Sequence, residues 1–234
     1  MNFIIVAAGK GTRIYKKLKK NKLLIKLNNE ILLETLVKNA IKCGFKKIFV
    51  VIGFKPKNII KILKKYKQVT FIKNKLFNKK EMFYSIICGL KYSKNDTLVS
   101  YSDIIYKKNL LIKIKKANTK KILLPVNLNW KKIWKIRNKS IYEDAETLAY
   151  NKKKELTEIG NRISKKNEPL SQFMGLIFIP KDKVKRVINY YQENNYSKMQ
   201  TTNFLNILLI NKEKIKVLPT RSFWYEFDDY EDFA

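Results

Sequence analysis

The sequence contains no histidine, two cysteines, and few residues that break regular structure, with 7 Gly and 5 Pro among 234 residues. Without histidine, acid–base catalysis by imidazole and histidine ligation of a metal are excluded. Cys43 and Cys88 are too few for a disulfide framework, so we expect a cytoplasmic protein. No apolar run approaches the roughly 18 to 20 residues that cross a bilayer, and the N-terminus has no signal-peptide pattern.

Acidic residues are also scarce, because 51 Lys and Arg stand against 19 Asp and Glu, a net charge of +32. Such an excess is typical of proteins that bind nucleic acid or an anionic membrane. However, 46 of these cations are Lys and only 5 are Arg, the residue suited to bidentate phosphate recognition. The lysines are spread over almost every segment, as on a solvated surface. We therefore expect no nucleic-acid partner and no transmembrane segment.

Hydrophobic residues make up 45% of the chain, enough for one sizeable core, which excludes intrinsic disorder. Strand and helix patterns alternate along the first half. Strands are predicted at residues 3–7, 48–52, 69–72 and 97–101, and helices at 31–43, 58–66, 82–90 and 110–116. This alternation predicts a parallel sheet with helices on both faces. Beyond Pro125 the pattern becomes irregular and rich in Trp, Tyr and acids.

The most informative segment follows the first predicted strand and reads Ala7-Ala8-Gly9-Lys10-Gly11-Thr12-Arg13. A doubly wound sheet binds its ligand at the carboxyl end of such a strand. Two glycines let the backbone approach a phosphate chain, and successive amide N–H groups can surround the anion. The loop is not a dinucleotide fingerprint, whose third glycine is replaced by Ile14, and not a Walker loop, because Gly11 follows Lys10. It therefore predicts a phosphate-binding loop of another kind.

This loop resembles the signature of the nucleoside triphosphate transferases with a GT-A-like Rossmann fold. Those enzymes join a nucleotide to a sugar phosphate, phosphocholine or a phosphonate. The resemblance continues at Asn21-Lys22-Leu23-Leu24, where the family has Pro-Lys-x-Leu, at Ser100-Tyr101-Ser102-Asp103, and at the closing Trp224-Tyr225-Glu226-Phe227-Asp228. It implies a single-domain α/β, Rossmann-like fold over 1–234 with a mixed, mostly parallel sheet. Residues 1–125 are then the nucleotide-binding half, and 126–234 the acceptor-binding and closing half.

The resemblance also implies roles for individual residues. Asp103 and Asp228 are expected to bind Mg²⁺, a hard cation that prefers carboxylate and phosphate oxygens. Arg13 and Lys22 are expected to stabilise the phosphates that leave as pyrophosphate. No general base is needed if the acceptor oxygen is already ionised, which agrees with the lack of histidine. The expected nucleotide contacts are Ala7, Ala8, Gly9, Gly11, Thr12, Arg13 and, for the base, Ser85.

The second half carries a longer pattern that resembles the cytidylyltransferase subgroup acting on phosphocholine and small phosphonates. Its parts are Trp130-x3-Trp134-x2-Arg137, Glu143-Asp144-Ala145-Glu146-Thr147 and Ser171-Gln172-Phe173-Met174-Gly175-Leu176. We expect Asp144 and Glu146 to face a cationic nitrogen of the acceptor. Trp130 or Trp134 is expected to form the pocket wall, Arg137 to bind phosphonate oxygens, and Gln172 to contact the acceptor. The alternative is that the acids neutralise neighbouring lysines.

The sequence thus predicts a Mg²⁺-dependent cytidylyltransferase that moves CMP from CTP to a small phosphonate or phosphocholine-like acceptor and releases pyrophosphate. One alternative is a sugar-1-phosphate nucleotidyltransferase that uses UTP or another nucleotide. Another is a basic protein that binds nucleic acid or a membrane surface and keeps a vestigial transferase site. Steeply salt-dependent binding to random duplex DNA favours the last reading. The sequence leaves open which acceptor is used and whether the protein is a homodimer.

Overall fold

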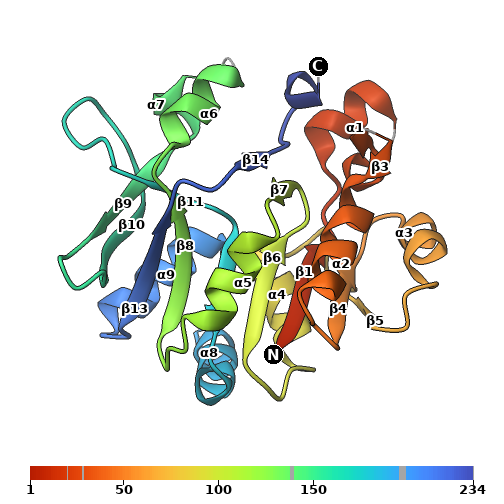
Figure 1. Ribbon diagram of the computed structural model, residues 1–234, viewed down its shortest axis with the longest axis horizontal. Coiled ribbons are helices and arrows are strands. Elements are labelled where there is room, and N and C mark those ends of the chain that lie inside the picture. The colour runs from red at the N-terminus through yellow and green to blue at the C-terminus, as the bar shows by residue number, and fades with distance from the viewer. Residues whose placement is uncertain (20, 28, 138–139, 195–198, 234) are drawn as a thin grey trace.

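The computed structural model describes residues 1–19, 21–27, 29–137, 140–194 and 199–233. Its main sheet has eight strands in the order β11-β8-β12-β6-β1-β4-β5, with β13 also paired to β8 (Figure 1). The parallel part consists of β1 (Asn2–Ala7), β4 (Ile48–Ile52), β5 (Val69–Lys73) and β6 (Thr97–Tyr101). From β1 the chain adds β4 and β5 on one side and then β6 on the other. The direction of winding therefore reverses at β1, which is where such sheets bind ligands.

The second half extends the sheet with strands of both directions. It contributes β8 (Ile122–Asn127), β11 (Gln172–Phe173), β12 (Leu176–Ile179) and β13 (Ile215–Thr220). Strand β12 is antiparallel to β6, and β13 is parallel to β8. Pro125 lies inside β8 and has no N–H to donate. Before Pro125 in the chain, β8 pairs with β12 at Leu123, and after Pro125 it pairs with β11 at Val126 and Asn127. The predicted mixed, mostly parallel sheet is confirmed.

Helices cover both faces of the sheet because the strands are apolar on both sides (Figure 1). Along β1, Phe3 and Ile5 belong to one core cluster, whereas Ile4 and Val6 belong to the other. The first cluster includes residues of α2 (Leu32–Lys42), α3 (Pro56–Leu63) and α5 (Asn109–Lys116). The second includes residues of α4 (Met82–Leu90), α8 (Lys181–Glu193) and α9 (Thr201–Ile210). No helix of the described residues is both long and apolar enough to cross a membrane.

The remaining elements lie outside the main sheet and its six covering helices. They are α1 (Thr12–Leu18), the 3-10 helices η1 (Lys22–Leu24) and η2 (Tyr230–Phe233), α6 (Trp130–Ile136), α7 (Ile141–Asp144), and the strand pairs β2 (Lys26–Leu27) with β3 (Glu30–Ile31), β7 (Ile104–Tyr106) with β14 (Trp224–Glu226), and β9 (Glu146–Tyr150) with β10 (Leu156–Arg162). In Figure 1 the C-terminal η2 lies beside α1. An ion pair of Lys17 with Glu231 joins these two elements, and Arg13 of α1 pairs with Asp229, which precedes η2.

Candidate active site

The glycine loop after β1 has two glycines with different requirements. Gly11 has φ +57°, and a Cβ there lies 3.1 Å from Cγ and Cδ of Lys22, so both its backbone conformation and the lysine stem favour glycine. A Cβ added at Gly9 would meet nothing within 4 Å among the described residues, its own two chain neighbours aside. The space in front of Gly9 therefore belongs to a cavity that a ligand can enter.

The step at the end of β4 fixes this loop from the side. The backbone N–H of Phe54 donates to the carbonyl of Ala8 at 3.0 Å. A Cβ on Gly53 lies 2.6 Å from Cβ of Phe77 and 2.8 Å from the Ala8 carbonyl oxygen, so only glycine fits without a shift. Gly53 and Phe54 thus hold the end of β4 against the glycine loop.

A first cavity of about 250 Å³ opens at this loop. It is lined by six of the residues that the sequence assigned to the site: Ala8, Gly9, Gly11, Lys22, Ser85 and Asp103. Three other expected nucleotide contacts do not line it. Ala7 is fully buried in the core, Thr12 is exposed in the first turn of α1, and Arg13 pairs with Asp229.

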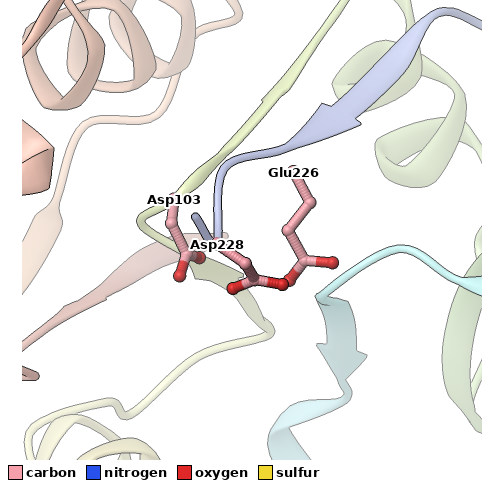
Figure 2. Close-up of side chains that lie close together, drawn as sticks. All are labelled: Asp103, Glu226 and Asp228. Carbon is pink, nitrogen blue, oxygen red and sulfur yellow. The ribbon is translucent and has the colours of Figure 1, made fainter. Parts of the chain in front are cut away.

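Three carboxylates meet beside this cavity. One oxygen each from Asp103, Glu226 and Asp228 lies within 4.8 Å of the others, and Figure 2 shows the three side chains pointing toward one another. Asp103 follows β6, whereas Glu226 ends β14. The pairing of β14 with β7 sets Glu226 opposite Ile104, and the N–H of Phe227 donates to the carbonyl of Asp103 at 2.9 Å. This acidic group was predicted only in part, since Glu226 was read as part of a motif and given no role.

Lys22 balances the charge of this acidic group. Its Nζ lies 2.5 Å from Oδ2 of Asp103, 3.9 Å from Oδ1 of Asp228, and 3.2 Å from the Phe227 carbonyl. Burial favours the neutral amine, but the charges of Asp103 and Asp228 outweigh it and raise the pKa of Lys22. Asn21 stands where the family has proline, and its side chain accepts a hydrogen bond from the N–H of Leu23. This bond caps the start of η1 and directs Lys22 inward.

Crowding of the carboxylates changes their acidity. Burial and the charge of Asp228 raise the pKa of Glu226 well above its usual range. Burial and the charge of Asp103 raise the pKa of Asp228, although Lys22 opposes this. A divalent cation relieves such repulsion, and an all-oxygen donor set is the one that Mg²⁺ prefers. The residues present therefore fit a hard divalent cation.

A second cavity of about 280 Å³ lies on the other side of the acidic group. Its acidic lining consists of Glu81, Asp144, Glu146, Glu226 and Asp228. Trp134 and Gln172, two of the residues expected to contact the acceptor, also line it. Glu81, Met82 and Tyr101 line both cavities, so the two spaces adjoin. The acidic group stands at their junction, with Asp103 in the first cavity and Glu226 and Asp228 in the second.

Glu146 is held in this second cavity by two neighbours. Thr202 donates to its carboxylate at 3.2 Å, and Nε2 of Gln172 donates to its backbone carbonyl at 2.5 Å. Burial and the nearby Asp144 raise the pKa of Glu146, although the Thr202 hydroxyl lowers it. Asp144 lies 3.8 Å from the Arg137 guanidinium, and among the described residues neither acid pairs with a lysine. The side chain of Glu143 lies outside what the structure describes.

Two acceptor assignments need correction. Trp130 is only 1% exposed, its Nε1 donates to the Pro169 carbonyl, and it packs edge-to-face against Trp134. Of the two tryptophans, Trp134 is the one that lines the second cavity. The Arg137 side chain is fully buried, and it binds Asp232 at 3.0 Å and Asp228 at 3.2 Å instead of facing the cavity. A buried guanidinium needs carboxylates of its own, so Arg137 supports Asp228 from behind.

Comparisons with known proteins agree with this geometry. A family model for the MobA-like NTP transferase domain matches residues 3–159. A CTP:phosphoglutamine cytidylyltransferase from Campylobacter jejuni is 26% identical over an alignment 248 positions long, gaps included, that covers 99% of this chain and 97% of the relative.

Two solved structures share the fold over nearly the whole chain. The inositol-1-phosphate CTP transferase from T. maritima aligns with a TM-score of 0.80 at 17% identity, over 100% of this chain and 91% of that one. The CTP:phosphocholine cytidylyltransferase from Streptococcus pneumoniae aligns with a TM-score of 0.75 at 17% identity, over 99% and 95%. At this identity the likeness concerns the fold alone.

Proposed function

The chain belongs to the MobA-like NTP transferase domain family, and from that premise we propose that it is a cytidylyltransferase. It transfers CMP from CTP to a small acceptor that carries a phosphate or phosphonate group, and it releases pyrophosphate. The choice of CTP is supported by the cytidylyltransferase that is 26% identical along nearly its full length.

The observation that carries this proposal is the junction of the two cavities at the acidic group. A transfer between two anionic substrates needs one space for each and a cation between them, and three carboxylates at the junction are the ligands that would hold such a cation. The first cavity begins at the glycine loop and contains Lys22, whereas the second is lined by carboxylates and Trp134. We assign CTP to the first cavity and the acceptor to the second.

In the proposed reaction, an acceptor oxygen attacks the α-phosphorus of CTP, and the bond from this phosphorus to the β-phosphate oxygen breaks. The amides of the loop at Gly9 and Gly11 bind the phosphate chain. Lys22 neutralises charge that builds up on the leaving pyrophosphate. Arg13, whose side chain is 62% exposed and pairs with Asp228 and Asp229, can turn toward the triphosphate at the cavity mouth.

Asp103 and Asp228 would hold Mg²⁺, with Glu226 as a third carboxylate beside them. When bound, the ion supplies a Lewis acid that lowers the charge repulsion between attacking and leaving oxygens. Arg137 and Asp232 keep Asp228 in place, because Asp232 also accepts the N–H groups of Asp228 and Asp229 at 2.7 and 2.9 Å.

For the acceptor, the acidic lining favours a molecule with a cationic nitrogen, such as phosphocholine or 2-aminoethylphosphonate. Asp144 and Glu146 supply the charge, and the Trp134 ring supplies an apolar wall on which a cation can lie. Phosphoglutamine, the acceptor named for the relative from Campylobacter jejuni, also carries an amino group. An acceptor of this class is what we expect.

The test is pyrophosphate release from each of the four nucleoside triphosphates with a panel of acceptors in the presence of Mg²⁺. The panel contains phosphocholine, 2-aminoethylphosphonate, phosphoglutamine, 2-hydroxyethylphosphonate and glucose 1-phosphate. We expect turnover with CTP and an amine-bearing acceptor. Preference for UTP with glucose 1-phosphate favours the sugar-1-phosphate alternative instead, and equal use of 2-hydroxyethylphosphonate contradicts the recognition of a cation.

A further inference from the structure

A buried asparagine lies directly behind the first cavity. Asn74 follows β5 and is 1% exposed. Its Oδ1 accepts the backbone N–H of Leu76 at 2.8 Å, and its Nδ2 lies 2.9 Å from Oγ of Ser85. Because a backbone N–H can only donate, the amide oxygen must face Leu76 and the amino group must face Ser85. The direction of the hydrogen bond to Ser85 is therefore fixed.

This fixed direction determines what the Ser85 hydroxyl can do. Ser85 lies on α4, is 5% exposed, and lines the first cavity. Its oxygen accepts from Asn74, and within the described part of the chain its own hydrogen reaches no acceptor. Buried donors are rarely left without a partner, so this hydrogen is available to a ligand in the cavity.

The surroundings of Ser85 suit a nucleotide base. The glycine loop and Lys22 form the phosphate end of the cavity, whereas Val6, Phe77 and Met82 provide apolar walls. A base has two apolar faces and an edge of ring nitrogens and carbonyl oxygens. The Ser85 hydrogen has no partner among the described residues and one oxygen lone pair is already used by Asn74, so the hydroxyl favours an acceptor atom on that edge over an N–H at the same place.

We propose that Asn74 is a positioning residue for nucleotide binding, because it fixes the Ser85 hydroxyl as a donor to an acceptor atom of the base. This inference rests on the proposed function for the location of the nucleotide. It adds a residue that contacts no substrate and acts through Ser85.

The variant that isolates this role is Asn74→Asp. It keeps the oxygen that accepts from Leu76 and nearly the same shape, but it replaces the donor to Ser85 with an acceptor. The hydroxyl hydrogen of Ser85 then turns toward the carboxylate and away from the base. At about pH 8.5, where the carboxyl is ionised, we expect CTP to bind at least about tenfold more weakly by titration calorimetry with Mg²⁺.

Asn74→Ala, Ser85→Ala and the double variant complete a cycle that a purely structural role would not reproduce. If Asn74 acts through Ser85, the double variant binds CTP no more weakly than Ser85→Ala. Ribose 5-triphosphate, which lacks the base, is the control ligand, and its affinity should stay within about twofold in every variant. Thermal unfolding of each variant verifies that the fold is retained.

Three results would overturn the inference. They are unchanged CTP affinity in both Asn74 variants, losses that add up in the double variant, and an equal loss for ribose 5-triphosphate. A wild-type chain that binds another nucleoside triphosphate instead of CTP contradicts the proposed function alone, because the same variants then test Asn74 against that nucleotide.

Discussion

At the scale of single residues, Asp103 follows β6 and Asp228 follows β14, and the two share one acidic group. We expect Asp103→Asn and Asp228→Asn each to abolish metal-dependent turnover and to weaken Mn²⁺ binding measured by electron paramagnetic resonance. The fold should be retained, because the amide has the shape of the carboxylate. Asp182→Asn, an exposed change in the first turn of α8, is the matched control. Near wild-type metal binding in either variant removes that residue from the metal site.

Lys22 is the cation in closest contact with the acidic group, and its side chain is 13% exposed. We expect Lys22→Ala to lower kcat/KM for CTP by about 30- to 1000-fold, which corresponds to about 2 to 4 kcal/mol of transition-state stabilisation. Arg13→Ala should have the smaller effect, because its guanidinium is exposed and screened by water. Lys16→Ala on the exposed side of α1 is the control. A change below about threefold in the Lys22 variant identifies a bystander.

The raised pKa of Glu146 in the second cavity predicts that acceptor binding depends on pH. Because burial raises the pKa of its carboxyl, the side chain loses its charge at a higher pH than an exposed glutamate does. Lowering the pH from about 8 toward about 5.5 should therefore raise the KM of an amine-bearing acceptor. In Glu146→Gln this KM should be at least about tenfold higher at pH 8 and should no longer rise as the pH falls. If the KM for CTP rises in parallel, Glu146 does not act on the acceptor.

At the scale of elements, alanine substitutions at two glycines at the same edge of the sheet are expected to have opposite effects, one on stability and the other on CTP affinity. Gly53→Ala places a Cβ against Phe77 and the Ala8 carbonyl, so it should lower the free energy of unfolding by about 1 to 3 kcal/mol. Gly9→Ala meets no protein atom within 4 Å, so its stability should stay close to wild type while CTP affinity falls. Chemical denaturation and calorimetry on both variants separate the two effects. Equal loss of stability in both contradicts this account of the loop.

Most elements of the first half could be predicted from periodicity and end signals. The strands at 48–52 and 97–101 and the helix at 82–90 have the predicted bounds. Gly44 follows α2 at φ +77°, the left-handed conformation in which glycine commonly ends a helix. The helix expected at 58–66 instead spans Pro56–Leu63, because proline fits the first turn of a helix. The second half could not be read this way, since β11 and β14 are two and three residues long and depend on distant partners.

Residues of the candidate site that belong to a motif could be identified from the sequence, whereas those placed by tertiary packing could not. Lys22, Asp103 and Asp228 were found from their motifs and lie together. Asn74 and Asp232 were missed, because a buried polar side chain has no signature in a single sequence. Arg137 was assigned to the acceptor, but only the tertiary contact with Asp232 reveals that its charge is already matched. Sequence identifies the residue types of a site, and the fold decides which of them face the ligand.

At the scale of the whole molecule, charge is distributed unevenly. The chain carries +32, yet the acceptor cavity is lined by five carboxylates, Glu81, Asp144, Glu146, Glu226 and Asp228. A basic surface attracts polyanions from a distance, and an acidic pocket within it selects for a group of opposite sign. Under the proposed function, we expect the lysines to favour arrival of the triphosphate and the second cavity to distinguish among acceptors.

This arrangement predicts a salt dependence. Raising KCl from about 50 to about 300 mM should increase the KM for CTP several-fold while kcat changes less, because screening shortens the range over which the surface attracts the nucleotide. Steady-state pyrophosphate release at each salt concentration measures this, with sucrose at matched osmolality as the control. A KM for CTP that does not change with salt contradicts a role for the surface charge.

The contact between α1 and η2 has a consequence for biosynthesis. A ribosome delivers β1, Lys22 and Asp103 early, and the parallel strands can pair while the remainder of the chain is still being made. Glu226 and Asp228 emerge last of the three-carboxylate group, followed by the η2 residues that bind α1. If the acidic group binds a divalent cation as we propose, that site is complete only after Asp228 has been made and β14 has paired with β7. We therefore expect metal binding to begin later in synthesis than the pairing of the parallel strands.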